Sequence, residues 1–372
     1  MVEQGTHKPL VGGSNPPSAT SIRPVDRISG GHPAGSGTTA PVTPPVRRAT
    51  APAGGDPLAP IVEALGVGAK RLGIPDGVSI VLAVSGGPDS SALLHGAVQL
   101  AARHGWRLTV AHLDHALRAE SAEEAASVAA ATAGLGLPAQ VRRTDVAALA
   151  TSEHRSLEDA GRQARYRFLE EVASGLGPGT LIATAHTADD AAETILLRLG
   201  RGAGLRGLRG IPGRRGRIVR PLLHARRADL RAALDAAGIG YLIDPSNADP
   251  AHARNRVRTE LMPALERLNP AAVEALNRLA GLAADDDDLL EGMAAADLLT
   301  RRDAADGSID WHRPPSRALG RRVLRLAIGD PSPSAERIEA LLDAAEGPRG
   351  GVSIELGRGR RAVVKERRIR LE

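Results

Sequence analysis

The sequence predicts an α/β protein with a doubly wound, mainly parallel sheet, followed by a small helical domain and a short C-terminal β segment. Short apolar segments at 78–84, 107–113, 139–143 and 180–185 alternate with alanine-rich stretches that have helical character, and a helix at 61–71 precedes them. Ligands of such sheets bind beyond the carboxyl ends of the strands. We therefore expect the residues that follow each strand to converge on one crevice.

The first 57 residues differ in composition from the rest of the chain. They are rich in Pro, Gly, Ser and Thr and have no apolar periodicity, so we expect residues 1–57 to be disordered. Codons for Gly13-Ser14-Asn15-Pro16 can reproduce the T-arm sequence of a tRNA gene. We therefore hypothesise that this tail results from a wrongly assigned start codon.

Three folded parts are expected after the tail. Residues 58–245 should form the α/β domain and residues 246–346 a helical domain. Residues 347–372 should form a short basic β segment with strands at 352–356 and 362–371.

Composition excludes several kinds of function. The 372 residues contain no cysteine, which excludes disulfides, thiolate metal sites, iron–sulfur clusters and thiol nucleophiles. Two tryptophans, two tyrosines and one phenylalanine are too few for a base-stacking platform. A pI near 10.3 instead favours a partner held through its phosphates. No run of 18 apolar residues and no signal core occur, so we expect a cytoplasmic protein with no membrane partner, and a homodimer is compatible with these features.

The most informative segment is the loop after the first predicted strand, Ser85-Gly86-Gly87-Pro88-Asp89-Ser90. A buried strand, a glycine turn and a helix N-terminus together direct several backbone N–H groups at one point, which suits a phosphate chain. The carboxylate of Asp89 can hold Mg²⁺. The Gly-x-x-x-x-Gly-Lys-Ser pattern of kinases and GTPases is absent, so the loop predicts ATP binding of another kind.

Polar residues follow the second and fourth predicted strands. They are His112, Asp114, His115 and Arg118 after the second, and His186, Asp189, Asp190 and Glu193 after the fourth. If a helix begins near Thr187, Asp189 and Glu193 share one face and Asp190 lies in the first turn, where carboxylates can hold Mg²⁺ or a substrate ammonium. Between the two groups, Arg162 and Arg165 lie on one side of a helix and could bind phosphate or carboxylate oxygens.

Two other patterns are weaker signals for a metal. The histidines at the strand ends lack the spacing of a catalytic zinc site. The run Asp285-Asp286-Asp287-Asp288 falls in a predicted helix, where consecutive carboxylates point in different directions. We interpret the run as a solvated face.

An arginine-rich stretch lies between Arg198 and Arg231. Its repeated glycines disfavour a stable helix, so we expect a mobile loop that clamps a phosphate backbone. Within it, Gly202-Ala203-Gly204-Leu205-Arg206-Gly207 fits a dinucleotide-binding pattern only formally, because it follows a helix and not a strand.

Taken in order, these motifs resemble the tRNA(Ile)-lysidine synthetase family of the PP-loop ATP-pyrophosphatase superfamily, over roughly residues 75 to 260. The matching segments are 85–90, 112–118, 164–166, 185–194, the arginine–glycine stretch, Arg220-Pro221-Leu222-Leu223, 244–247 and 254–258. The resemblance implies an adenine nucleotide alpha hydrolase-like fold. It also implies a reaction in which the wobble cytidine of a CAU anticodon is adenylated at C2 by ATP and lysine then displaces AMP.

The resemblance also implies roles for individual residues, with ATP and Mg²⁺ as cofactors and L-lysine and tRNA(Ile) as partners. Implied catalytic residues are Asp89, Asp189, Asp190, Glu193 and Arg118, with Asp89 as the Mg²⁺ ligand. Implied ATP-binding residues are Ser85, Gly86, Gly87, Pro88, Asp89, Ser90 and His112. His115, Arg162, Arg165 and His186 would contact substrate or phosphate, and Arg201, Arg206, Arg254, Asn255, Arg256 and Arg258 would bind tRNA, with help from the helical domain.

Three alternatives were weighed. The tRNA 2-thiolation enzymes share the loop but need cysteine or an iron–sulfur cluster. A small-molecule adenylating or amidating PP-loop ligase, similar to NAD synthetase, remains an alternative, although it has no need of an arginine-dense loop. A non-catalytic nucleotide sensor or RNA-binding module is disfavoured because unneeded carboxylates in a phosphate pocket would repel the ligand.

Overall fold

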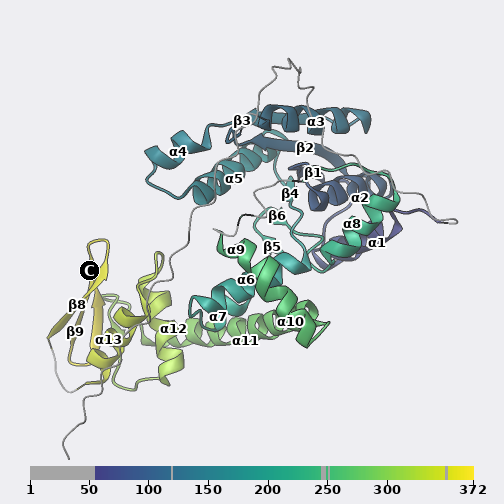
Figure 1. The fold of residues 1–372 in the computed structure, drawn as a ribbon. Coiled ribbons are helices and arrows are strands. Elements are labelled where there is room, and N and C mark those ends of the chain that lie inside the picture. The colour runs from purple at the N-terminus through teal and green to yellow at the C-terminus, as the bar shows by residue number, and fades with distance from the viewer. Residues whose placement is uncertain (1–54, 119, 244–248, 250–251, 348–350) are drawn as a thin grey trace, which may run out of the picture. The chain divides into compact units, whose positions relative to one another are not determined.

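The computed structural model describes residues 55–118, 120–243, 249, 252–347 and 351–372. The expectations for the N-terminal tail fall almost entirely outside the described residues, and the whole 244–247 motif lies outside them. The α/β part begins with α1 (Ala59–Arg71), β1 (Ser79–Ala83), α2 (Pro88–His104), β2 (Arg107–Asp114), α3 (Ser121–Gly134) and β3 (Ala139–Arg143) (Figure 1). It continues with α4 (Val146–Ser152), α5 (Leu157–Gly175), β4 (Leu181–Ala183) and α6 (Ala188–Gly200).

The sheet has the strand order β3-β2-β1-β4-β6-β5, and its neighbours are parallel except β5 and β6. The predicted strands and the mainly parallel arrangement are therefore confirmed, with small differences at the strand ends. β1 lies between β2 and β4, so the chain changes its direction of progress through the sheet at this point. A crevice at the carboxyl ends of β1 and β4 follows from this topology.

Helices cover both faces of the sheet. Ile80 and Leu82 of β1 pack on one face with apolar residues of α1, α2 and α8 (Arg227–Ala236). Val81, between them, packs on the opposite face with Phe168 and Leu169 of α5. This alternation is the period of two expected for a strand, and it buries β1 on both sides.

The prediction of a mobile loop between Arg198 and Arg231 is wrong for much of that stretch. The stretch contains α7 (Leu205–Leu208) and a hairpin of β5 (Arg214–Arg215) and β6 (Ile218–Val219), which extends the sheet beside β4. The fully buried side chain of Val219 anchors this hairpin. Arg198 donates to the carbonyl oxygens of Gly207 and Gly210, and Arg220 to that of Pro212, so the arginines themselves order the chain.

The C-terminal part is helical and then β. It contains α9 (Ala253–Arg256), a π-helical turn (Val257–Leu261), α10 (Met262–Leu268), α11 (Ala272–Arg301), α12 (Arg317–Ile328) and α13 (Ala335–Glu346). A four-stranded antiparallel sheet of order β7-β10-β9-β8 packs its apolar side against α13 around a core that includes Trp311. Its strands are β7 (Ile309–Asp310), β8 (Val352–Gly357), β9 (Arg360–Lys365) and β10 (Arg368–Leu371).

Two predictions for this part are wrong. The single strand expected at 362–371 is two strands, because Glu366 and Arg367 adopt φ of 50° and 54° and form a turn between β9 and β10. The run 285–288 is not a uniformly solvated face, since Asp287 is buried. Its carboxylate accepts hydrogen bonds from Arg209, at the C-terminal end of α7, and from Arg322 of α12. Within the described ranges no helix is long and apolar enough to cross a membrane.

Candidate active site

The loop after β1 is held in shape by its own serines. The Ser85 N–H donates to Ser90 Oγ at 3.2 Å, and Ser90 Oγ in turn donates to the Gly87 carbonyl oxygen at 2.9 Å. The N–H groups of Gly86 and Gly87 donate to no acceptor in the part of the chain that the structure describes. The loop is therefore preformed, with backbone donors available to an anion.

Gly86 is required by the geometry of this loop. Its φ of 84° lies in the left-handed region, and a Cβ at this position would come within 2.6 Å of Leu242 Cδ1. The Leu242 N–H also donates to the Gly86 carbonyl oxygen. Residues that follow α8 thus close over the loop, and only glycine fits beneath them.

The helix that follows β4 supplies three carboxylates to the same region. Thr187 caps α6: its N–H and its hydroxyl both donate to Asp190 Oδ2 at 2.9 Å, and the Asp190 N–H donates back to the hydroxyl oxygen. This reciprocal capping orients Asp190 in the first turn beside Asp189, with Glu193 one turn further. Asp189, Asp190 and Glu193, together with Asp89, are called the carboxylate cluster below.

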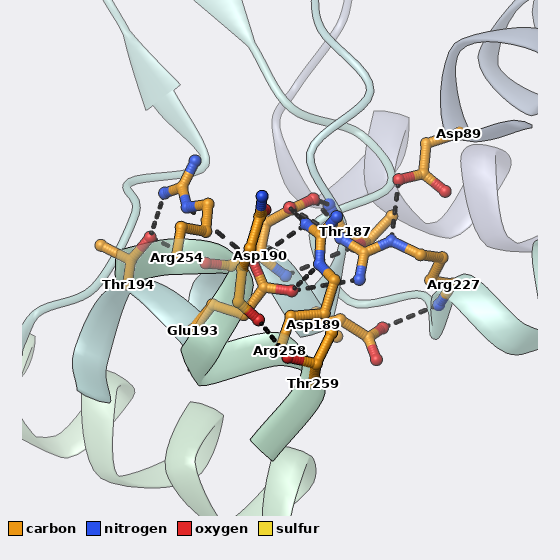
Figure 2. Close-up of polar contacts among 12 residues, drawn as sticks. Asp89, Thr187, Asp189, Asp190, Glu193, Thr194, Arg227, Arg254, Arg258 and Thr259 are labelled. Carbon is orange, nitrogen blue, oxygen red and sulfur yellow. Dashed lines mark hydrogen bonds and ion pairs between the residues drawn. The ribbon is translucent and has the colours of Figure 1, made fainter. Parts of the chain in front are cut away.

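One arginine joins all four members of the carboxylate cluster (Figure 2). Arg227 is the first residue of α8, and its N–H donates to Asp189 at 2.7 Å. The Arg227 guanidinium donates through Nε to Asp89 at 3.1 Å, through Nη2 to Asp190 at 2.7 Å and through Nη1 to Glu193 at 3.2 Å. Our sequence interpretation counted Arg227 only among the arginines of a phosphate clamp, so its place in the site was missed.

Glu193 is the most enclosed member of the cluster. Its side chain is only 2% exposed and accepts two hydrogen bonds from Arg258, at 2.8 and 3.1 Å, besides the one from Arg227. Arg254 lies 3.8 Å from the same carboxylate and donates to Thr194. Two arginines interpreted as tRNA contacts thus turn toward Glu193 in this structure, and the carboxylate has little capacity left for a substrate.

The carboxylates of the cluster differ from one another in proton affinity. Burial raises the pKa of Asp89 above its usual value, and the attraction of Arg227 offsets this only in part. Burial acts on Asp190 in the same direction, but Arg227 and the hydrogen bonds from Thr187 outweigh it and hold the pKa of Asp190 below its usual value. Asp190 is therefore a firmly ionised carboxylate, whereas the charge of Asp89 is incompletely compensated.

Asp89 also carries an unused ligand atom. Its Oδ1 is buried and has no hydrogen-bond partner among the described residues. A carboxylate oxygen of this kind fits Mg²⁺, which in proteins is bound through one or two carboxylates with water and substrate phosphates completing the shell. No group of three or more His, Asp or Glu residues in the described ranges could hold a metal alone. The site thus fits an ion that arrives with a nucleotide.

Three histidines lie at the ends of β2 and β4, and the structure lowers the pKa of two of them, His115 and His186. His112 is buried and its Nδ1 hydrogen-bonds to the Val84 carbonyl oxygen at 2.8 Å. Burial and the charge of Arg165, whose Nη2 lies 3.4 Å from His115 Nε2, lower the pKa of His115 to about 4. Burial also lowers the pKa of His186 to about 4. Neither of the latter two gains a proton near neutral pH.

The remaining predicted site residues have varied surroundings. The Arg162 guanidinium lies over the ring of Tyr166 at 5.1 Å, and Arg118 pairs with Glu124 at 3.3 Å. Asn255 donates to the Asp249 carbonyl oxygen at 2.9 Å. Arg201, Arg206 and Arg256 form no side-chain hydrogen bond or ion pair with any residue that the structure describes.

Comparison with known proteins agrees with this geometry. The family model of the PP-loop domain matches residues 69–265, which spans the sheet, the loop after β1 and the carboxylate cluster. The fold and the site therefore define a protein of the PP-loop class, which uses ATP. The tRNA(Ile)-lysidine synthases of Geobacter sulfurreducens and Salinispora tropica are both 46% identical to the chain, over 260 and 231 residues, and that of Thermus thermophilus is 44% identical over 220 residues. The chain belongs to the tRNA(Ile)-lysidine synthase family.

The matches cover only part of each protein. The match to the Geobacter protein includes 68% of this chain and 55% of that protein, and the match to the Salinispora protein 60% and 68%. The match to the Thermus protein includes 59% of this chain and 42% of that protein. The chain therefore spans between two fifths and about two thirds of the length of these relatives. Among solved structures, the U34-tRNA thiolase NcsA from Methanococcus maripaludis superposes with a TM-score of 0.50 at 13% identity, over 60% of this chain and 80% of that one. That likeness concerns the fold alone.

Proposed function

We propose that the protein is a ligase that joins lysine to C2 of the wobble cytidine in the CAU anticodon of tRNA(Ile), through an adenylated cytidine and at the expense of ATP. The observation that carries the proposal is the carboxylate cluster, in which the loop residue Asp89 and the α6 residue Asp190 bind the Arg227 guanidinium and Asp189 accepts from the backbone N–H of the same arginine. A phosphate loop and a set of carboxylates within reach of each other suit a reaction that consumes ATP and then takes up an ammonium-bearing substrate.

In the first step the loop would bind the phosphates that leave as pyrophosphate. The free N–H groups of Gly86 and Gly87 and the start of α2 stabilise negative charge, and the preformed loop gives them their positions before ATP arrives. Mg²⁺ held by Asp89 would add charge stabilisation for the leaving group. Arg165, whose side chain is directed at His115 beside β2, is the candidate contact to the adenylate.

In the second step lysine must be bound as an ammonium and lose a proton to become a nucleophile. Glu193 is poorly suited to either task because three arginines surround its carboxylate. Asp189 accepts from the Arg227 backbone through one oxygen, while the other lies 3.5 Å from Arg226. We propose that Asp189 and Asp190 receive the lysine ammonium, and that Glu193 positions Arg227 and Arg258.

Contacts to tRNA would come from arginines that have no internal partner. Arg206 of α7 and Arg325 of α12 form no ion pair among the described residues. With Arg322 and Glu291 they line a cavity of about 160 Å³. We propose that this cavity receives a backbone phosphate, which makes the helical residues after 246 part of the tRNA-binding surface.

The test is transfer of labelled lysine, with ATP and Mg²⁺, to a transcript of tRNA(Ile) with a CAU anticodon. The CAU-bearing tRNA(Met) serves as the competing substrate. Label in the first transcript alone is expected, and Asp89→Asn should abolish it while the folded fraction and melting profile stay close to those of the unmodified protein. Asp286→Asn, which changes an exposed carboxylate of α11, is the matched control and should retain activity.

A folded, ATP-binding protein that labels neither transcript would contradict the proposal. It would favour the alternative considered above, a PP-loop ligase acting on a small molecule. No feature of the site speaks specifically for that alternative.

A further inference from the structure

The proposed reaction does not explain why Arg227 lies at the centre of the carboxylate cluster. Its guanidinium lies between the phosphate loop and α6, bound to Asp89 on one side and to Asp190 and Glu193 on the other. Two of these, Asp89 and Asp190, are groups that the proposed function uses for Mg²⁺ and lysine. An internal cation therefore occupies both in this structure.

The charges explain why a cation must be there. Without Arg227, the carboxylates of Asp89 and Asp190 would face each other, and among the described residues Arg258, 3.5 Å from Asp190, would be the remaining ion-pair partner. The Arg227 guanidinium lies 3.1 Å from Asp89 and 2.7 Å from Asp190, so it separates two carboxylates that would otherwise repel each other.

The contact to Asp89 is the one that nucleotide binding would break. The carboxylate of Asp89 would be neutralised by a bound Mg²⁺, and bound phosphates would bring negative charge to the loop beside it. A guanidinium is then attracted away from a neutralised carboxylate and toward phosphate oxygens, which it binds well. The backbone N–H of Arg227 remains bonded to Asp189, so only the side chain has to move.

We propose that Arg227 is an exchangeable counter-ion: it holds Asp89 and Asp190 in the nucleotide-free protein, and Mg·ATP binding transfers its guanidinium from these carboxylates to the phosphates. The proposal rests on the proposed function for the identity of the ligands. It has a further consequence, because transfer releases Asp190 Oδ1 as well as Asp89 Oδ2. Lysine should therefore bind after ATP.

The test measures binding in Arg227→Gln and Arg227→Lys, with Arg231→Gln as the matched control. Arg231 lies one turn further along α8, is exposed and donates to the Tyr241 hydroxyl. In Arg227→Gln, Mg²⁺ alone should raise the melting temperature clearly more than in the unmodified protein, since Asp89 has lost its competitor. At saturating Mg²⁺, ATP should bind about tenfold or more weakly, the loss expected for a charge-assisted hydrogen bond. Arg227→Lys should lie between the two, and Arg231→Gln should match the unmodified protein.

Three results would overturn the proposal. Unchanged ATP affinity would mean that the guanidinium never reaches the phosphates, and an unchanged response to Mg²⁺ would mean that it does not compete for Asp89. A lower melting temperature without either shift would mark Arg227 as purely structural. Lysine transfer is assayed separately: its absence alongside the expected binding pattern would refute the proposed function and leave the exchange intact.

Discussion

Replacing Asp287 by alanine should destabilise the protein far more than the same change at its neighbour Asp288. Asp287 is 2% exposed and bonds to Arg209 at 2.8 Å and Arg322 at 2.6 Å. Loss of one partner from a buried ion pair costs about 3–5 kcal/mol, because the remaining charge stays uncompensated. Arg209 and Arg322 are 35% and 13% exposed, so water can partly hydrate them and we expect the lower limit, about 3 kcal/mol. For a domain of this size the melting temperature should fall by about 6–12 °C.

Asp288 is an internal control for this experiment. It contacts the same Arg209 nitrogen at 2.8 Å, but its side chain is 66% exposed, so Asp288→Ala should cost about 1 kcal/mol or less. The assay is thermal unfolding followed by far-ultraviolet circular dichroism. Equal losses in the two variants would refute the reasoning, because burial would then not determine the strength of the pair.

The pH dependence of unfolding gives an independent check. Burial acts to raise the pKa of Asp287, but the hydrogen bonds from Arg209 and Arg322 prevail and hold that pKa below its usual value. A carboxylate whose pKa is lower in the folded state stabilises the fold above its unfolded pKa of about 4, and this contribution disappears as the pH falls through the folded value. The difference in stability between the unmodified protein and Asp287→Ala should therefore shrink below about pH 4.

Three further predictions concern the loop, the histidines and the arginines. Gly86→Ala should cost about 1–2 kcal/mol, because alanine is strained at a φ of 84° and crowds Leu242, and nucleotide titration should show weaker ATP binding. His186 has a pKa of about 4 when folded and about 6.5 when unfolded, so the protein should lose stability as the pH falls from 6.5 to 4, and His186→Asn should reduce that slope in denaturant unfolding. Arg206→Glu with Arg325→Glu should weaken tRNA binding and lower its dependence on salt by about one unit or more of log–log slope.

The arginine and histidine predictions each have a control. For the arginines it is Arg103→Glu, which makes the same change of charge as either single variant, Arg206→Glu or Arg325→Glu, at an exposed arginine near the end of α2; an effect equal to theirs would indicate nonspecific attraction. For His186 it is the exposed His252, whose replacement by asparagine should leave the slope in place. Unimpaired ATP binding by Gly86→Ala would show that the loop tolerates a different backbone.

The parts that could be predicted from sequence are those with local signals. The phosphate loop is preceded directly by its strand and contains its own glycines, and the helix α6 begins directly after its capping residue Thr187. Each signal therefore lies within a few residues of the structure that it predicts. Parallel pairing then places Asp89 and Asp189 at the same edge of the sheet, since β1 and β4 are neighbours. Local patterns and one rule of topology were thus enough for the phosphate loop and most of the carboxylate cluster.

Partners that are distant in sequence could not be predicted in this way. Arg227 is 138 residues from Asp89, and Arg209 is 78 residues from Asp287. In the sequence each of these arginines is one of several positive charges in a basic stretch. No neighbouring residue indicates that the arginine binds a carboxylate far away in the chain. The expectation of a mobile clamp failed for the same reason, because the internal acceptors that order the stretch are visible only in the fold.

The π-helical turn over Val257–Leu261 constrains how this segment can change in length. Arg254 and Arg258 contact Glu193 of α6, while Val257 and Met262 are buried with Ala188 of the same helix and neighbouring residues. Each residue turns a helix by about 100°. Deleting one residue here would restore the hydrogen-bond pattern of an α-helix, but it would rotate the residues after the deletion relative to those before it. Either the arginine or the apolar contact would then be lost. The segment should accept many substitutions but neither an insertion nor a deletion. In a library of random one-codon deletions, variants that lack a residue of this segment should be absent from the folded, active population.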